Sequence, residues 1–238
     1  MPMVEPTEIR ALLVSRDNEM LAIFSDIFRE LGIVVQGYAD ESSAALGLQA
    51  GRFEALVVDF DNLGSTRKII ATLRESPSSK NALIFAVASG GPSRTEALEQ
   101  GVNFSLERPF NRAHIQEVLH TAYGLMLRER RRYFRYPVSL PVRLRRITGA
   151  ELHCTSINIS RNGMALHVPS ALDLGDNIKV AFALTNSDRM VKGEGTVVWD
   201  DKHGKAGLSF QCETLDDQNR LAAWLDNQFY RQLNPAHV

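Results

Sequence analysis

The sequence predicts two folded units of different class: an α/β unit with a doubly wound, parallel five-stranded sheet, and an antiparallel six-stranded β-barrel that ends in a helix. In the first half, five short apolar runs alternate with five helical patterns, which is typical of a parallel sheet covered on both faces. From Val138 the pattern changes to short runs with period two, separated by turn residues. The length of 238 residues suits two small domains or one large one.

The first half reads in order as strand and helix. Continuous apolar runs are typical of strands buried on both faces, and we expect strands at 9–14, 33–39, 53–61, 82–89 and 102–110. Apolar residues at helical spacing predict helices over 18–32, 40–51, 65–75, 95–101 and about 112–132. Gly32 is a helix stop, and Ser93 with Glu96 forms a capping-box pattern that predicts the start of the fourth helix.

Ligands of parallel sheets bind at the carboxyl ends of the strands. Those ends carry Ser15, Arg16 and Asp17; Asp59 and Asp61; Ala88 and Ser89; and Arg108 before Pro109. In order and spacing, residues 8–125 resemble the receiver domain of bacterial response regulators, which has a flavodoxin-like fold.

The resemblance implies that Asp59 matches a phosphoryl-accepting aspartate, a Mg²⁺-binding acidic pair follows the first strand, and a lysine ends the fifth. Here Ser15 and Arg16 replace the pair, and Arg108 takes the lysine position. Because Mg²⁺ needs several oxygen ligands, we expect no metal-dependent phosphorylation, so that Asp59 is a vestigial phosphoacceptor with Arg16 as a candidate ion-pair partner. A phosphorylation-responsive regulator that acts through Asp59 is the alternative.

Arginines gather at the junction of the two halves. Eight of the 21 arginines fall between Arg128 and Arg146. Four of them stand close together among aromatic residues, where like charges repel and a multiply charged anion would relieve the repulsion: Arg130, Arg131, Arg132 and Arg135. On the helix before them, Leu125 and Leu127 leave two alternatives open, a homodimer contact or packing against the second unit.

Two motifs accompany the predicted barrel, one before its first strand and one within it. One is RxxxR, at Arg131 to Arg135, and the other is NxSxxG, at Asn158, Ser160 and Gly163. Together with the alternating strands, they make residues 128–235 resemble the PilZ domain. A helix over about 216–232 would cover the barrel. The expected division is a receiver-like domain over 1–125 and a PilZ domain over 126–238.

The PilZ resemblance implies a receptor for the bacterial second messenger cyclic di-GMP. It assigns phosphate and guanine contacts to Arg131 and Arg135, because a guanidinium can bind either group through two hydrogen bonds. Asn158 and Ser160 would contact guanine edges, and Gly163 would allow a positive φ or a close approach of backbone.

Three further side chains are weaker candidates for the same ligand. A stacked second copy of cyclic di-GMP would offer acceptors to Arg130 and Arg132. Trp199 has two interpretations, as a residue that stacks on a base or as an aromatic residue of the barrel core or rim.

Composition excludes several other classes. A net charge of −1 and the lack of a helix-turn-helix pattern argue against DNA binding. No apolar run approaches a membrane span, and the start MPMVEPTEIR does not read as a signal peptide. With two cysteines and no metal-ligand or catalytic spacing, we expect a cytoplasmic protein without metal, cofactor or enzymatic activity.

The sequence therefore predicts a cyclic di-GMP receptor that relays binding by rearrangement of its domains or of a protein partner. A ligand-free adaptor, whose PilZ-like barrel only docks proteins, is a further alternative.

Overall fold

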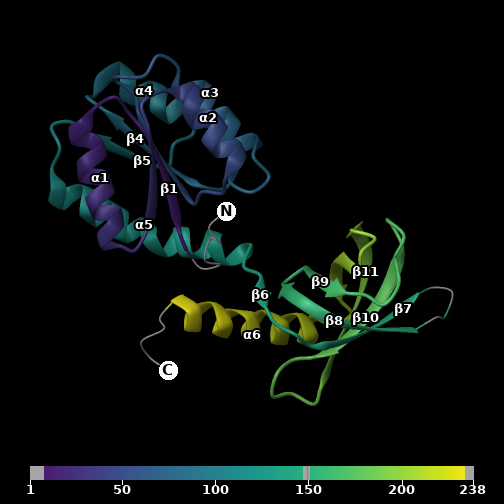
Figure 1. Cartoon of the computed structure of the whole chain (residues 1–238). Helices are drawn as coiled ribbons and strands as arrows, with labels where there is room; N and C mark the ends of the chain where they lie inside the picture. Colours follow the sequence, from purple (N-terminus) through teal and green to yellow (C-terminus); the bar gives the residue numbers. More distant parts are fainter. Residues whose placement is uncertain (1–7, 147–148, 150, 234–238) are drawn as a thin grey trace. The chain divides into compact units, whose positions relative to one another are not determined.

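A computed structural model describes residues 8–146, 149 and 151–233 of the chain. They form two compact units, of which the first ends at Arg130 and the second begins at Arg131 (Figure 1). The boundary, like the expected one after residue 125, falls inside a single helix. Most of the segment on which the expectation about a signal peptide rests lies outside the described residues.

The first unit has the predicted alternation of strands and helices. Its elements are β1 (Arg10–Val14), α1 (Asn18–Glu30), β2 (Val34–Tyr38), α2 (Glu41–Ala50), β3 (Ala55–Asp59), α3 (Thr66–Glu75), β4 (Leu83–Ala88), α4 (Gly91–Glu99), β5 (Phe104–Glu107) and α5 (Arg112–Arg132). The strands pair in parallel in the order β2-β1-β3-β4-β5. This is the order of flavodoxin and of chemotaxis receivers, so the prediction of a doubly wound, receiver-like fold is confirmed.

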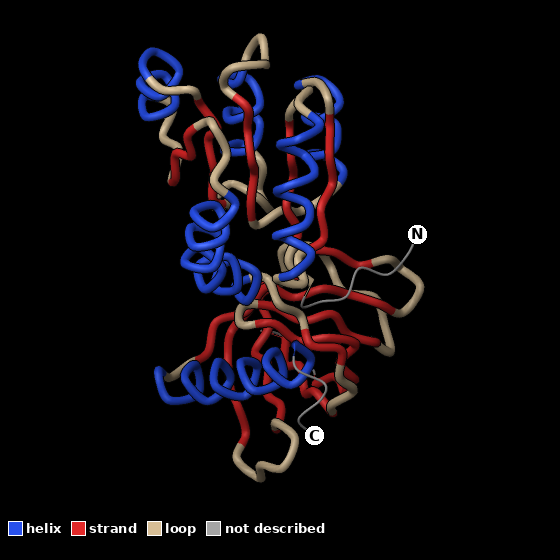
Figure 2. The backbone as a smooth tube through the Cα atoms, turned by 90° about the vertical axis from the view of Figure 1, so that its left-hand side faces the viewer, coloured by secondary structure: helices blue, strands red, loops and turns tan. Residues whose placement is uncertain are grey.

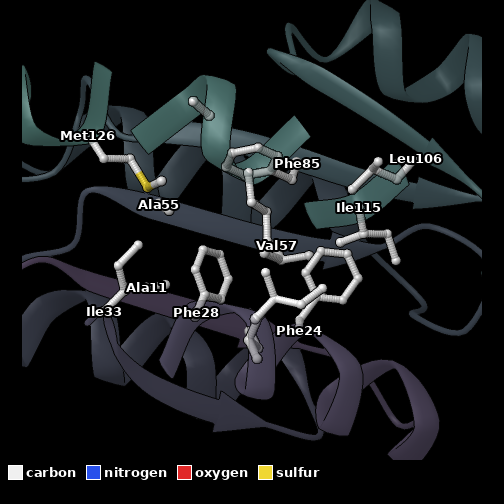
Figure 3. Packing of buried hydrophobic residues seen from close by; sticks show 14 of the residues in the cluster. Ala11, Phe24, Phe28, Ile33, Ala55, Val57, Phe85, Leu106, Ile115 and Met126 are labelled. Carbon is white, nitrogen blue, oxygen red and sulfur yellow. The ribbon is translucent and has the colours of Figure 1, made fainter. Parts of the chain in front are cut away.

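Helices cover both faces of this sheet. One buried cluster joins α1 and α5 to the sheet through Phe24, Phe28, Ile115 and Met126. Figure 3 shows Met126 beside Ala55 and Ile115 beside Leu106. A second cluster joins α2, α3 and α4 to the opposite face. Side chains that alternate along β1, β3 and β4 supply the two clusters, which explains why these strands read as continuous apolar runs.

Two helix starts show how local signals work here. Asp17 caps α1, because its Oδ1 accepts hydrogen bonds from the backbone N–H groups of Glu19 and Met20, at 2.9 and 3.2 Å. The capping-box prediction for α4 is wrong. That helix begins at Gly91 with Pro in its first turn, where proline's fixed φ suits a helix start, so Ser93 already lies inside it.

The second unit is a closed barrel. Its elements are β6 (Tyr136–Pro137), β7 (Pro141–Arg146), β8 (Glu151–Ser160), β9 (Gly163–His167), β10 (Asn177–Ala183), β11 (Met190–Asp200), β12 (Lys205–Cys212) and α6 (Leu215–Leu233). The order β8-β7-β10-β11-β12-β9 closes through antiparallel pairing of β9 with β8, and β6 adds to β8 outside the ring. Figure 2 shows the strands of this unit in red and its helix in blue. The predicted six-stranded barrel is confirmed.

Helix α6 packs on this barrel through one apolar face, and Leu221, Leu225 and Phe229 are buried. The ring N–H of Trp224 donates to Thr185 Oγ1 at 2.9 Å, beyond the end of β10. The predicted C-terminal helix is therefore present. In the part of the chain that the structure describes, no helix combines the length and apolar character needed to span a bilayer.

Candidate functional site

The carboxyl end of the parallel sheet holds a closed network around Asp59. This carboxylate is fully buried. Its Oδ2 accepts from the Ser15 hydroxyl at 2.6 Å, from the Asn62 amide at 2.9 Å and from Arg108 Nη2 at 2.9 Å. Its Oδ1 accepts from the backbone N–H groups of Asp61 and Asn62. The oxygens that a phosphoryl group would have to approach are thus engaged by the protein itself.

Arg108 is the cation of this network. Its guanidinium also pairs with Asp17, and its Nε lies 3.3 Å from Asp61 Oδ2. Burial lowers its pKa, but hydrogen bonds and attraction from Asp17 and Asp59 outweigh that effect and raise the pKa above its ordinary value. The expectation that Arg16 pairs with Asp59 is wrong. Arg16 Nε instead donates to the Ala39 carbonyl at 3.3 Å, because the Arg16 side chain lies over the end of β2.

These residues do not fit a magnesium site. Ser15 occupies a position of the acidic pair and donates to Asp59, while Arg108 brings a fixed positive charge among the three remaining carboxylates. Within the described ranges, no group of three or more His, Cys, Asp or Glu side chains is arranged to hold a metal ion. A hard cation would meet repulsion here in place of free oxygen ligands.

The arginine cluster is divided between the two units. Arg130 belongs to the first unit, where its Nη1 lies 3.5 Å from Oε1 of Glu54, a carboxylate that is fully buried. Glu54 also pairs with Arg52 at 2.9 Å and accepts from the backbone N–H of Arg10. It precedes β3 and therefore lies at the opposite end of that strand from Asp59.

In the second unit, the barrel brings parts of both motifs together. Arg135 Nη1 donates to Asn158 Oδ1 at 3.3 Å, across 23 positions of sequence. A Cβ added to Gly163 would lie 3.6 Å from Arg135 Nη2 and 2.8 Å from the carbonyl oxygen of Leu208. Close approach of backbone, rather than a positive φ, explains the glycine at this position.

Ser160 has a structural task in the turn between β8 and β9. Its side chain is largely buried, and its hydroxyl donates to the carbonyl oxygen of Gly163 at 3.0 Å. The hydroxyl proton is therefore used within the motif, and only the oxygen lone pairs remain for a ligand.

Arg131 makes a different contact from Arg135. Its Nη1 lies 3.3 Å from Oδ2 of Asp226 on α6. Arg161, inside the second motif, contacts the other oxygen of the same carboxylate at 2.7 Å. One carboxylate thus joins the two motifs, and neither Arg161 nor Asp226 is marked by a local sequence signal.

Trp199 lies on the outer barrel face in the same cross-strand row as Asn158. The row runs from Trp199 through Gly207 and Ala165 to Asn158. A Cβ on Gly207 would lie only 2.0 Å from the Trp199 ring nitrogen, so the indole packs directly on the glycine. With 42% of its surface exposed, Trp199 is not a core residue. Ala165 lies between Gly207, which the indole covers, and Asn158.

A hollow of about 1070 Å³ lies elsewhere on the barrel, along β7, β10, β11 and β12. Its lining includes Arg145, Lys179 and Glu194 but no residue of either motif. Lys179 and Glu194 neutralise each other there at 3.3 Å.

Comparison with known proteins identifies the barrel. Residues 129–227 match the family model described as PilZ domain. The second unit is a PilZ domain. The motif residues of the site all lie within the matched range. The strands that close the barrel, β8 and β9, carry Asn158, Ser160 and Gly163. No match to a curated protein was found.

Solved structures similar to parts of the chain include the receiver domain of the sensor histidine kinase PA1611 from Pseudomonas aeruginosa PAO1, with 23% identity, TM-score 0.44 and coverage of 49% of this chain and 98% of that one. The chemotaxis response regulator CheY4 of Vibrio cholerae has 21% identity, TM-score 0.44 and coverage of 48% and 98%. The Bacillus subtilis inhibitor of motility MotI/DgrA has 23% identity, TM-score 0.36 and coverage of 43% and 51%. The receiver-like fold of the first unit rests on its strand order rather than on these likenesses.

Proposed function

We propose that the protein is a cyclic di-GMP receptor, and that the PilZ domain binds this ligand on the outer barrel face where its two motifs meet. Arg131, Arg135, Asn158, Ser160 and Gly163 form the proposed site. Arg130, Arg132 and Trp199 are secondary candidates.

The observation that carries the proposal is the convergence of Arg135, Asn158 and Gly163. A guanidinium offers paired donors to a phosphate or to the O6 and N7 acceptors of guanine. The amide of Asn158 can both donate to and accept from a base edge, and the absence of a side chain at Gly163 leaves room beside Arg135. Donors for a phosphate and for a base therefore lie within reach of one small molecule.

The cross-strand row adds a surface for a base. Because the indole of Trp199 covers Gly207, only the small residue Ala165 lies between Trp199 and Asn158 in this row. A planar ring that contacts Asn158 through its edge would lie over Ala165, beside the half-exposed indole. Base–aromatic contact of this kind contributes about 1–3 kcal/mol.

The receiver-like domain has a structural part in this proposal. With five hydrogen bonds to its carboxylate and no exposed surface, Asp59 is a poor acceptor for a phosphoryl group. Incubation with acetyl phosphate and Mg²⁺, followed by intact-mass measurement, tests this directly. Addition of one phosphoryl group that disappears in Asp59→Asn would favour the phosphorylation-responsive alternative.

The relay would run through α5. This helix begins in the first unit and ends at Arg132, inside the first motif, so capture of a ligand by Arg131 and Arg135 acts on its last turn. Ligand capture can reorient the domains only to the extent that it binds the two arrangements with different affinity. A scattering curve that changes at saturating cyclic di-GMP supports this relay, and an unchanged curve contradicts it. The cytoplasmic location stays a prediction.

Isothermal titration with cyclic di-GMP tests the receptor function. Arg135→Ala removes a motif guanidinium, and Arg143→Ala is the matched control, since Arg143 is an exposed arginine on β7 outside both motifs. A micromolar Kd corresponds to about −8 kcal/mol, and loss of charge-assisted hydrogen bonds worth about 1.5–3 kcal/mol weakens binding by roughly 10- to 150-fold. We expect wild-type affinity in the control. Absence of binding by the wild-type protein would favour the ligand-free adaptor.

A further inference from the structure

The carboxylate of Asp226 lies where an anionic ligand of this domain would be expected. Asp226 lies on α6, 95 positions from Arg131 and 65 from Arg161 in sequence. Its Oδ2 accepts from Arg131 and its Oδ1 accepts from Arg161. The three side chains are 27%, 29% and 38% exposed, so they are partly shielded but open to exchange with solvent.

Two guanidinium groups that converge on one carboxylate form an anion subsite. A phosphate diester carries the same single negative charge and presents two charged oxygens, so it can replace a carboxylate between the same donors. Arg131 opens the first motif and Arg161 lies inside the second. The subsite is therefore built from the same two segments as the contact between Arg135 and Asn158.

We infer that Arg131 and Arg161 form a phosphate subsite of the PilZ domain, and that Asp226 is a built-in competitor for it. This inference rests on the proposed function. Entry of the dinucleotide exchanges the Asp226 carboxylate for a phosphate, and the ion pairs that tie α6 to both motifs are lost in the exchange. Arg161 becomes a ligand contact that the motif pattern does not name.

The rest of α6 stays packed during this exchange. Phe229 lies edge-to-face with Phe134 at 5.2 Å, and Trp224 lies edge-to-face with Tyr136 at 5.3 Å. These contacts and the buried apolar face of the helix do not involve Asp226. Competition by Asp226 therefore changes ligand affinity and the mobility of α6 without requiring the barrel to unfold.

Asp226→Asn is the direct test, with Asp216→Asn as matched control. The amide keeps the size of the side chain but removes the charge, and Asp216 is an exposed aspartate of the same helix that pairs with Arg189. Because two partly exposed ion pairs no longer have to be broken, we expect cyclic di-GMP to bind about 3- to 10-fold more tightly to Asp226→Asn. The control variant should bind as the wild type does.

A double-mutant cycle separates competition from a general change in charge. In the Arg161→Ala background, binding should be weaker, and Asp226→Asn should then tighten it by a smaller factor. Hydrogen exchange of α6 should rise when ligand is added to the wild-type protein and should already be high in Asp226→Asn. Circular dichroism and thermal unfolding verify that each variant is folded.

The outcomes separate this inference from the function on which it rests. If the wild-type protein binds and Asp226→Asn binds equally or more weakly, Asp226 is not a competitor. If only Asp226→Asn binds, Asp226 competes strongly enough to block the site, and the receptor function of the wild-type protein fails. If neither protein binds cyclic di-GMP, the receptor function fails, and the exchange fails with it.

Discussion

Replacement of Arg108 by Met should destabilise the receiver-like unit more than loss of a surface arginine does. Removing one partner of a buried ion pair costs about 3–5 kcal/mol. Asp59 is fully buried but keeps the hydrogen bonds from Ser15, Asn62 and Asp61, so the lower end of this range applies. Asp17 is partly exposed, and its pairing adds less than about 1 kcal/mol.

This loss is large enough to measure by calorimetry of the full chain. With an unfolding entropy of about 2.1 cal/mol/K per residue over roughly 125 residues, each kcal/mol shifts Tm by about 4 °C. A loss of about 3 kcal/mol therefore lowers the Tm of the first unit by about 12 °C, while the transition of the PilZ domain serves as internal reference. Arg94→Met is the matched control, since Arg94 pairs with Glu107 in the same unit and both are more than half exposed.

The pH dependence gives a second readout. Burial raises the pKa of Asp17 and Asp61, but hydrogen bonds from Arg108 to Asp17 and from Ser89 to Asp61 outweigh it, and both pKa values are held below 3.8. A lowered pKa in the folded state stabilises the protein above about pH 4 and ceases to do so as the pH falls through the folded pKa. The Tm difference between wild type and Arg108→Met should therefore shrink below pH 4.

Two results would refute this reasoning about Arg108. The first is a Tm shift no larger than that of Arg94→Met. The second is a Tm difference from the wild type that is the same at pH 3 and pH 7.

The remaining predictions concern the barrel. Gly163→Ala places a Cβ 2.8 Å from the Leu208 carbonyl oxygen and should destabilise the PilZ domain by about 1–3 kcal/mol in thermal unfolding. Gly124→Ala, on α5, is the control and should be neutral or stabilising, since a Cβ there would have nothing within 4 Å. Equal effects of the two substitutions would contradict the close-approach argument. Burial raises the pKa of both thiols, that of Cys154 to about 11, and Cys154 is the less accessible of the two. A thiol reagent at pH 8 should therefore modify Cys212 first, as peptide mapping would show, and prior modification of Cys154 would disprove it.

The sequence was sufficient to predict both folds because each depends on a periodic pattern. Strands of the parallel sheet are buried on both faces, and the barrel strands alternate, so the pattern changes at the domain junction. The position of Arg108 at the end of β5 was also visible. The sequence did not show that Arg108, rather than Arg16, pairs with Asp59. Both arginines follow strands, and only the path of each loop decides which guanidinium reaches Asp59.

The candidate site was predictable only in part. Arg135, Asn158 and Gly163 were identified from their motifs, and the barrel brings them together. Glu54 and Asp226 were missed because they pair with arginines 76 and 95 positions away. Pairing across such distances is set by tertiary packing, and no local spacing records it.

These two carboxylates change the argument drawn from the arginine cluster. Its like charges suggested that an external anion is needed to relieve repulsion, but Glu54 and Asp226 already supply negative charge to Arg130 and Arg131. Exchange of one anion for another at Arg131 then yields little net electrostatic energy. Selectivity for a dinucleotide would have to come from base contacts at Arg135, Asn158 and Trp199. On this reasoning, inorganic phosphate and pyrophosphate should compete poorly with cyclic di-GMP, although each of their phosphate groups carries at least the single charge of a diester.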